Sequence, residues 1–195
     1  MRILVTGGSA SGKSAFAEKI ACSFAGPHLY FATMRPFGED GQRRIARHRA
    51  LRRDRDFLTV ECYGRYEELS LAATLGQDVS GSTLLVECVG NIVANVQFGD
   101  ELSCGALTCG AFEDALAEKV VQGVTSLADQ CQNIVVVTNE VGCDGIEYPA
   151  ETQAYIRALG AANCKLAVQF DAVYEVAAAC PIALKLPKGG LPWEL

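Results

Sequence analysis

The sequence lacks several features that mark large classes of proteins. No apolar run approaches the roughly 20 residues that a helix needs to span a bilayer, so we expect no membrane insertion. The nine cysteines are odd in number and none stands in a C-x-x-C pair, which argues against a disulfide framework or a zinc site. The first residues run straight into an apolar segment and show no signal-peptide pattern. These features predict a cytoplasmic protein with small, buried, reduced cysteines.

Positive charge is also scarce. The formal net charge of −6 argues against a protein that binds nucleic acid over its whole surface, so we expect no nucleic-acid partner. Half of the residues are hydrophobic and 21% are charged, which suits a packed core rather than general disorder. We find no internal repeat and no linker in the 195 residues. This length predicts a single domain over residues 1–195.

The most specific signal lies in the first fourteen residues, MRILVTGGSASGKS. An apolar strand over residues 3–5 leads into a segment that fits G-x-x-x-x-G-K-[ST] at every fixed position. Glycines let the backbone wrap around a di- or triphosphate, and the N-terminus of the following helix adds partial positive charge. Lys13 is then expected to reach the β- and γ-phosphates, and the Ser14 hydroxyl to bind Mg²⁺. The motif predicts a nucleoside triphosphate site made of Gly7, Gly8, Ser9, Ala10, Ser11, Gly12, Lys13 and Ser14.

Apolar and amphipathic segments alternate along the rest of the chain. Short apolar segments predict strands over residues 28–33, 57–62, 82–89, 133–138, 172–178 and 182–186. Longer segments with helical character occur at residues 15–24, 42–55, 65–75, 91–98, 111–132 and 149–170. The alternation predicts an α/β protein of the P-loop NTPase fold, with a mostly parallel central sheet flanked by helices. Ligands of such sheets bind at the carboxyl ends of the strands.

Three glutamates fall at or near these strand ends. Glu87 ends the run LLVE, where a P-loop enzyme usually carries a carboxylate that holds Mg²⁺ directly or through water. The alternative for Glu87 is a solvated glutamate at a strand end. Glu61 and Glu140 are acceptor carboxylates, and each could bind a ribose, a guanine edge or a metal. The sequence alone does not rank these roles.

Seven arginines between residues 43 and 55 surround His48, one of only two histidines. The segment could be a solvated helix face or an RNA-binding patch, although no aromatic residues are interleaved in it. On a helix, Arg44, His48 and Arg52 share a face, and nearby cations keep an imidazole neutral and nucleophilic. The arginines would also neutralise phosphate oxygens during displacement at phosphorus. A lone histidine is more often structural, so the residues alone leave both roles open for His48.

Taken together, the motifs resemble the bifunctional adenosylcobinamide kinase / adenosylcobinamide-phosphate guanylyltransferases of cobalamin (vitamin B12) biosynthesis. The resemblance runs through ILVTGGSASGKS, LYFAT, RRIARHR, TVEC, LLVEC, VVVTNEVG and DAVYEVAAACPIALK. It implies an enzyme with two reactions. A kinase reaction moves the γ-phosphate of ATP or GTP to the hydroxyl of the aminopropanol arm of adenosylcobinamide. In the second reaction a histidine attacks the α-phosphorus of GTP, pyrophosphate leaves, and GMP passes to adenosylcobinamide phosphate to give adenosylcobinamide-GDP.

The resemblance also implies roles for particular residues. His48 matches the guanylylated histidine, which with Lys13 makes the catalytic pair, and Ser14 and Glu87 would hold Mg²⁺. The nucleotide contacts carry over to residues 7–14 and to Ala32, Thr33, Met34, Arg49, Ala50, Leu51, Arg52, Glu61 and Glu87. The family further implies a corrinoid substrate and a homotrimer in which the helix bearing the histidine lies near a subunit interface.

The sequence departs from the family pattern in a few places. Ala10 stands where arginine is frequent, Arg47 stands where some members have a second histidine, and Asn163-Cys164 stands where an Asn-Gln pair is usual. The closest alternative is therefore a P-loop small-molecule kinase without guanylyltransferase activity. A regulatory GTPase would need an N-K-x-D motif, which the chain lacks. An RNA-binding or ring-forming ATPase that uses the arginine segment is disfavoured by the acidic net charge.

Overall fold

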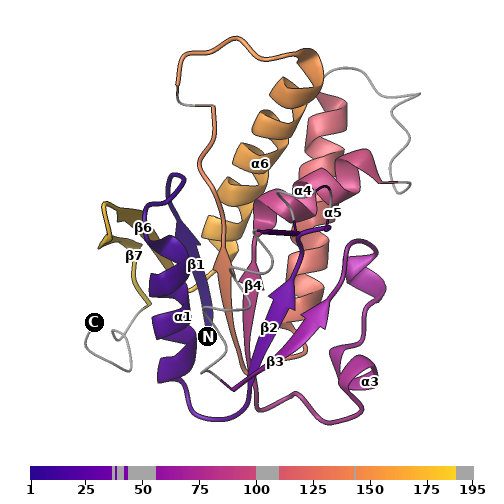
Figure 1. Cartoon of the computed structure of the whole chain (residues 1–195), viewed down its shortest axis with the longest axis vertical. Coiled ribbons are helices and arrows are strands. Elements are labelled where there is room, and N and C mark those ends of the chain that lie inside the picture. The colour runs from indigo at the N-terminus through magenta and orange to yellow at the C-terminus, as the bar shows by residue number, and fades with distance from the viewer. Residues whose placement is uncertain (37, 39–41, 44–55, 100–109, 143, 188–195) are drawn as a thin grey trace.

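The computed structural model describes residues 1–36, 38, 42–43, 56–99, 110–142 and 144–187. Within them the strands form one seven-stranded sheet of order β3-β2-β4-β5-β1-β6-β7 (Figure 1). Every neighbouring pair is parallel except β6 with β7. The strands are β1 (Arg2–Thr6), β2 (His28–Ala32), β3 (Phe57–Glu61), β4 (Thr83–Glu87), β5 (Asn133–Val137), β6 (Ala172–Ala177) and β7 (Cys180–Lys185). The predicted α/β fold with a mostly parallel sheet is confirmed.

Helices cover both faces of this sheet (Figure 1). They are α1 (Lys13–Ser23), the 3-10 helix η1 (Tyr66–Glu68), α3 (Leu71–Leu75), α4 (Val89–Phe98), α5 (Ala111–Ala128) and α6 (Ala150–Gln169). Alternate residues of one strand serve the two faces. Leu84 and Val86 of β4 join the core formed with α4, α5 and α6, whereas Leu85 joins the core formed with α1. Burial on both faces explains why the central strands read as continuous apolar runs.

The predicted helix over residues 65–75 is wrong in its middle. η1 ends at Glu68, and α3 begins only after Ser70, whose extended backbone has φ −99° and ψ 111°. The Ser70 hydroxyl accepts a hydrogen bond from the Ala73 N–H at 3.2 Å and so caps α3. An N-cap residue needs a non-helical backbone, so one helix cannot run through Ser70.

Two other predicted elements were too long. The strand expected over residues 82–89 ends at Glu87, because Cys88 is the N-cap of α4 and Val89 is its first residue. The helix expected over residues 111–132 ends at Ala128. The earlier end of β4 places Glu87 at the edge of the sheet, directly before a helix N-terminus.

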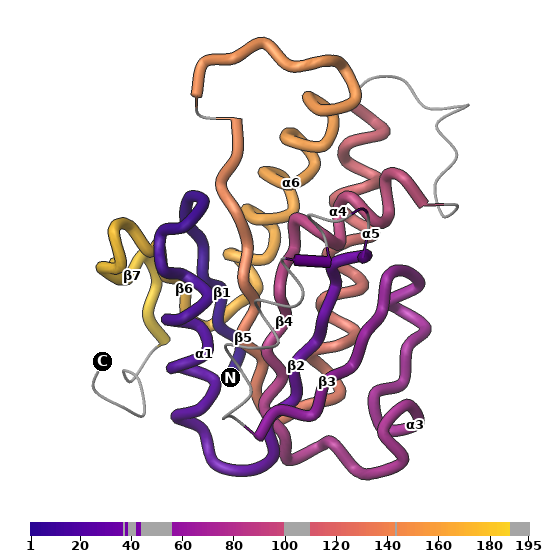
Figure 2. Tube along the Cα trace, in the orientation of Figure 1, coloured from indigo at the N-terminus to yellow at the C-terminus, as the bar shows by residue number. Residues whose placement is uncertain are grey.

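The parallel strands bring their carboxyl ends to the same edge of the sheet. The trace that leaves β5 climbs away from that edge and turns over into α6 (Figure 2). α6 in turn packs against α4 and α5, so residues of α6 reach the same edge as the strand ends. Among the described helices, none has both the length and the apolar character that crossing a membrane would require.

Candidate functional site

The glycine-rich motif forms a tight loop between β1 and α1. Gly7 has φ 150°, and Gly12, the N-cap of α1, has φ 96°. A β-carbon on Gly7 would collide with the carbonyl oxygen of Val176 on β6. Ala10 adopts a left-handed φ of 58° without being glycine. The loop thus holds a backbone shape that glycines permit, at the positive end of α1.

Replacing Gly7 by alanine is expected to lower the free energy of unfolding by about 1–3 kcal/mol, because the new β-carbon meets Val176 and the backbone is strained. Urea unfolding followed by circular dichroism measures the loss. Gly8→Ala is the matched control, since no atom lies within 4 Å of its β-carbon position. It should cost less than about 1 kcal/mol. Equal losses in the two variants would contradict this account of the loop.

Lys13 begins α1 and is buried under the loop. Its Nζ donates a hydrogen bond to the carbonyl oxygen of Gly8 at 2.9 Å. Burial lowers the pKa of the Lys13 ammonium, while the nearby side chains of Cys88, Glu87 and Glu140 act in the opposite direction. The cation is therefore held among acidic groups, folded back on the loop that would receive phosphate.

Glu87 is bound through both carboxylate oxygens. The Ser14 hydroxyl donates a hydrogen bond to Oε1, and the Tyr30 hydroxyl donates one to Oε2 at 2.9 Å. The Ser14 hydroxyl and the Glu87 carboxylate offer only oxygen atoms as metal ligands. Such ligands suit a hard cation that also binds phosphate oxygens. Ser14 and Glu87 therefore fit the predicted magnesium site. Tyr30 was not predicted, because its apolar strand indicates only a core residue.

The predicted residues on β2 and β3 stand beside Glu87 across the sheet. Ala32 is in register with Glu61 on one side and with Glu87 on the other. Thr33 is buried and links two strands, since its hydroxyl donates to the Glu87 carbonyl oxygen at 2.7 Å. Glu61 accepts a hydrogen bond from the Tyr63 hydroxyl at 3.1 Å. Ala32, Glu61 and Glu87 thus form one row along the edge that carries the P-loop.

Glu140 lies against the other side of the P-loop. Its backbone N–H donates to the Gly7 carbonyl oxygen at 3.3 Å. The Thr6 hydroxyl donates to its carboxylate at 3.3 Å. The Glu87 and Glu140 carboxylates, at and beyond the ends of β4 and β5, therefore both lie near Lys13.

The chain can be compared with known proteins on this basis. The family model described as "Cobinamide kinase / cobinamide phosphate guanyltransferase" matches residues 3–184. The chain belongs to this family. It is 30% identical over 188 residues to the bifunctional adenosylcobalamin biosynthesis protein CobU of Salmonella typhimurium, covering 95% of this chain and 100% of that protein. It is 31% identical over 186 residues to the bifunctional adenosylcobalamin biosynthesis protein CobP of Pseudomonas aeruginosa, covering 95% and 98%.

Membership of the cobinamide kinase / cobinamide phosphate guanyltransferase family confirms the predicted enzyme class. The family carries both named activities, so the alternative of a kinase without guanylyltransferase activity is not favoured. The matched residues, 3–184, contain nearly all of the motifs that carry the resemblance.

Two solved structures share the fold at low sequence identity. One is an ATPase from the type III secretion system of pathogenic bacteria, with a TM-score of 0.55, 14% identity, and coverage of 89% of this chain and 50% of that one. The other is project PH0250 from Pyrococcus horikoshii OT3, with a TM-score of 0.51, 11% identity, and coverage of 95% and 86%. These likenesses confirm the P-loop fold and carry no further conclusion.

Five predicted site residues lie outside the described part of the chain, namely His48, Arg49, Ala50, Leu51 and Arg52. The remaining predicted residues are described. Those of the P-loop, of the end of β2 and of Glu61 and Glu87 lie at the carboxyl edge of the sheet.

A second group of polar side chains lies beside Glu87, and sequence reasoning did not predict it. Cys88 is buried, which raises the pKa of its thiol, and its sulfur accepts a hydrogen bond from the Asn139 amide at 3.5 Å. Tyr155 reaches the same place from α6, and burial raises the pKa of its phenol to about 12. Asn139 belongs to the quoted TNEVG motif. For Tyr155 there was no sequence signal, because a helical pattern does not say which of its residues meets a distant strand end.

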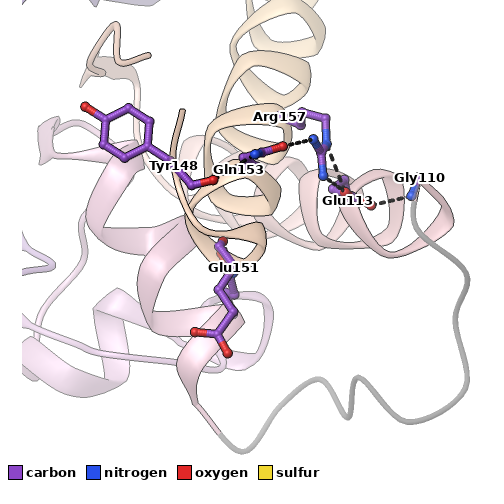
Figure 3. Close-up of polar contacts among 7 residues, drawn as sticks. Gly110, Glu113, Tyr148, Glu151, Gln153 and Arg157 are labelled. Atoms are coloured by element: carbon purple, nitrogen blue, oxygen red, sulfur yellow. Dashed lines mark hydrogen bonds and ion pairs between the residues drawn. The ribbon is translucent and has the colours of Figure 1, made fainter. Parts of the chain in front are cut away.

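A polar network fixes the start of α6 to its neighbours (Figure 3). Arg157 forms an ion pair at 2.7 Å with buried Glu113 of α5, and Glu113 accepts the Gly110 N–H at 2.5 Å. Gln153 donates to the Tyr148 carbonyl oxygen at 2.7 Å. Arg157 thus compensates the charge of the buried Glu113 carboxylate. The ion pair therefore joins α5 to the part of α6 that carries Tyr155.

Proposed function

We propose that residues 1–195 form one transferase domain that phosphorylates adenosylcobinamide and then transfers GMP from GTP to adenosylcobinamide phosphate. The observation that carries the proposal is the cluster of Lys13, Ser14 and Glu87 at the P-loop, in a chain that matches the family over nearly its whole length. A single phosphate site would then serve both reactions, with ATP or GTP as the donor in the first and GTP in the second.

The P-loop amides and Lys13 would hold the triphosphate, which explains why a cation is buried beside the glycine-rich loop. Ser14 and Glu87 would hold Mg²⁺, which when bound supplies positive charge to the phosphate oxygens. Tyr30 keeps the Glu87 carboxylate turned toward Ser14. The site would thus bind the nucleotide before either acceptor reacts.

For guanylyl transfer we propose His48 as the nucleophile. Its neutral imidazole would attack the α-phosphorus in line, pyrophosphate would leave, and the arginines that flank it would stabilise the charge that develops on the phosphate oxygens. Splitting the transfer into two displacements replaces one difficult step by two easier ones. The support for this role is the arginine-flanked position of His48 and its match to the family's guanylylated histidine.

The proposal extends to the localisation, the oligomeric state and the partners of the protein. We propose a cytoplasmic homotrimer with a corrinoid substrate and no nucleic-acid partner. Unpaired thiols support a reducing compartment, and those described are Cys22, Cys62, Cys88, Cys131, Cys164 and Cys180. Of these only Cys88 is buried, so the predicted burial of the cysteines is wrong for the others. Sedimentation equilibrium at any mass other than that of three chains would contradict the trimer.

The direct test is to incubate the purified chain with adenosylcobinamide, Mg²⁺ and either ATP or GTP, and to separate the corrinoids by chromatography. Adenosylcobinamide phosphate is expected with either nucleotide, and adenosylcobinamide-GDP only when GTP is present. Phosphate product without any GDP product would instead support a plain kinase. No corrinoid product would contradict the proposal.

A further inference from the structure

Three polar atoms from three separate segments of the chain converge at Gly90 in the first turn of α4. The place where a β-carbon on Gly90 would stand lies 2.8 Å from the Tyr155 hydroxyl oxygen, 3.2 Å from Asn139 Nδ2 and 3.8 Å from Cys88 Sγ. Any larger residue at this position would push these groups apart. The missing side chain of Gly90 therefore leaves room for a phenol and an amide side by side.

This cluster lies next to the position expected for the terminal phosphate. Cys88 directly follows Glu87, whose carboxylate contacts Ser14 of the P-loop. The Cys88 side chain is also close enough to Lys13 to act on the pKa of its ammonium. Lys13 is the residue that reaches the β- and γ-phosphates in a P-loop site. Asn139 and Tyr155 line one side of Cys88, since the Asn139 amide donates to its sulfur and the Tyr155 hydroxyl lies with both groups around Gly90. An acceptor hydroxyl that approaches the γ-phosphate from that side would meet these two side chains.

The two groups differ in how they are held. Asn139 is held at both its backbone and its side chain, since Asn163 Nδ2 donates to its backbone carbonyl oxygen at 3.2 Å and its own amide donates to Cys88 Sγ at 3.5 Å. The half-buried Tyr155 hydroxyl, by contrast, makes no hydrogen bond to any residue in the described part of the chain. This hydroxyl is therefore available to form a hydrogen bond with a bound molecule. With a pKa of about 12, this phenol stays protonated at neutral pH.

We propose that Tyr155 and Asn139 form the subsite for the acceptor hydroxyl in the kinase reaction, which rests on the kinase activity proposed above. The Tyr155 oxygen accepts a hydrogen bond from the hydroxyl of the aminopropanol arm and turns a lone pair of that hydroxyl toward the γ-phosphorus. The Asn139 amide donates to an oxygen of the transferring phosphoryl group. A bond forms between the acceptor oxygen and the γ-phosphorus, the bond from the γ-phosphorus to the bridging oxygen breaks, the nucleoside diphosphate leaves, and the acceptor's proton is released to water.

The test compares Tyr155→Phe with the wild-type chain in both half-reactions. Loss of one hydrogen bond in a half-buried site should lower kcat/KM for adenosylcobinamide about tenfold. The KM for ATP and the rate at which GTP labels the protein should stay within about twofold, because neither involves the acceptor hydroxyl. Tyr148→Phe is the matched control, since the Tyr148 hydroxyl contacts exposed Asp144 at 2.5 Å, away from the subsite. This variant should keep wild-type kinetics.

Gly90→Ala provides a second variant that leaves Tyr155 in place. Its β-carbon takes the space at the Tyr155 hydroxyl, so acceptor kcat/KM should fall while labelling by GTP persists. Because both changes act on one contact, the double variant should lose little more than Gly90→Ala alone. Wild-type acceptor kinetics in Tyr155→Phe, or equal losses in acceptor and nucleotide steps, would overturn the subsite while leaving the proposed function intact. A wild-type chain with no kinase turnover would overturn both.

Discussion

Lys13→Ala is expected to lower kcat/KM of both the kinase and the guanylyltransferase reactions by at least about a hundredfold. The alanine removes the buried cation that lies between the P-loop carbonyl of Gly8 and the carboxylates of Glu87 and Glu140. The phosphates then lose a fixed positive charge in the ground state and in the transition state. Steady-state rates with adenosylcobinamide and with adenosylcobinamide phosphate measure the two effects separately.

Lys19→Ala is the matched control, because Lys19 lies on the same helix but is exposed. Its two activities should equal those of the wild-type chain. An unaffected kinase activity in Lys13→Ala would contradict a phosphate site shared by both reactions.

His48→Ala is expected to abolish guanylyl transfer and to leave GTP binding and the kinase reaction largely intact. The variant removes the nucleophile and keeps the P-loop, whose residues bind the triphosphate. Isothermal titration with GTP and the two corrinoid assays measure the three properties. Retained transfer of GMP by this variant would remove His48 as the nucleophile.

The second histidine of the chain offers a matched control. His28 begins β2, its Nε2 lies 3.1 Å from the carbonyl oxygen of Phe24, and its ring packs edge-on against Phe57 of β3, so its role is structural. His28→Ala should keep guanylyl transfer even if the chain becomes less stable. Equal loss of transfer in the two variants would show that the effect is structural.

The parts of the site that follow from short motifs could be predicted from the sequence. The spacing of Gly7, Gly12 and Lys13 fixes a loop and a helix start, and the apolar run before Glu87 fixes a strand that ends in a carboxylate. In each case the determining residues are neighbours in sequence. The parallel strands then carry these separate ends to one edge, as the alternation of strands and helices predicted.

Features made by distant residues could not be predicted. Tyr30 reads as a core residue of an apolar strand, and only the pairing of β2 with β4 brings its hydroxyl to Glu87. Tyr155 is one residue among many on a helix, and its place depends on how α6 packs over α4. Side-chain contacts across elements depend on the packing angle of the helices, which periodicity does not contain.

The start of β7 was missed for a different reason. The turn between β6 and β7 consists of Ala178 and Ala179, both with positive φ. Turns of this kind are usually made by Asn-Gly or similar pairs, so two alanines give no turn signal. The hairpin also supports the site, because the Ala179 N–H donates to the Ser11 carbonyl oxygen at 2.8 Å. The predicted strand began at residue 182, whereas β7 begins at Cys180.

The most direct measurement is to incubate the purified protein with Mg²⁺ and GTP labelled at the α-phosphate, to denature it, and to search for label on the chain. A guanylylated histidine predicts label that is labile in acid, stable in alkali and located at His48 after proteolysis and mass spectrometry. The same label should be absent from His48→Ala and present on His28→Ala. Protein that binds GTP but carries no label from the α-position would contradict the histidine route and would leave a kinase alone.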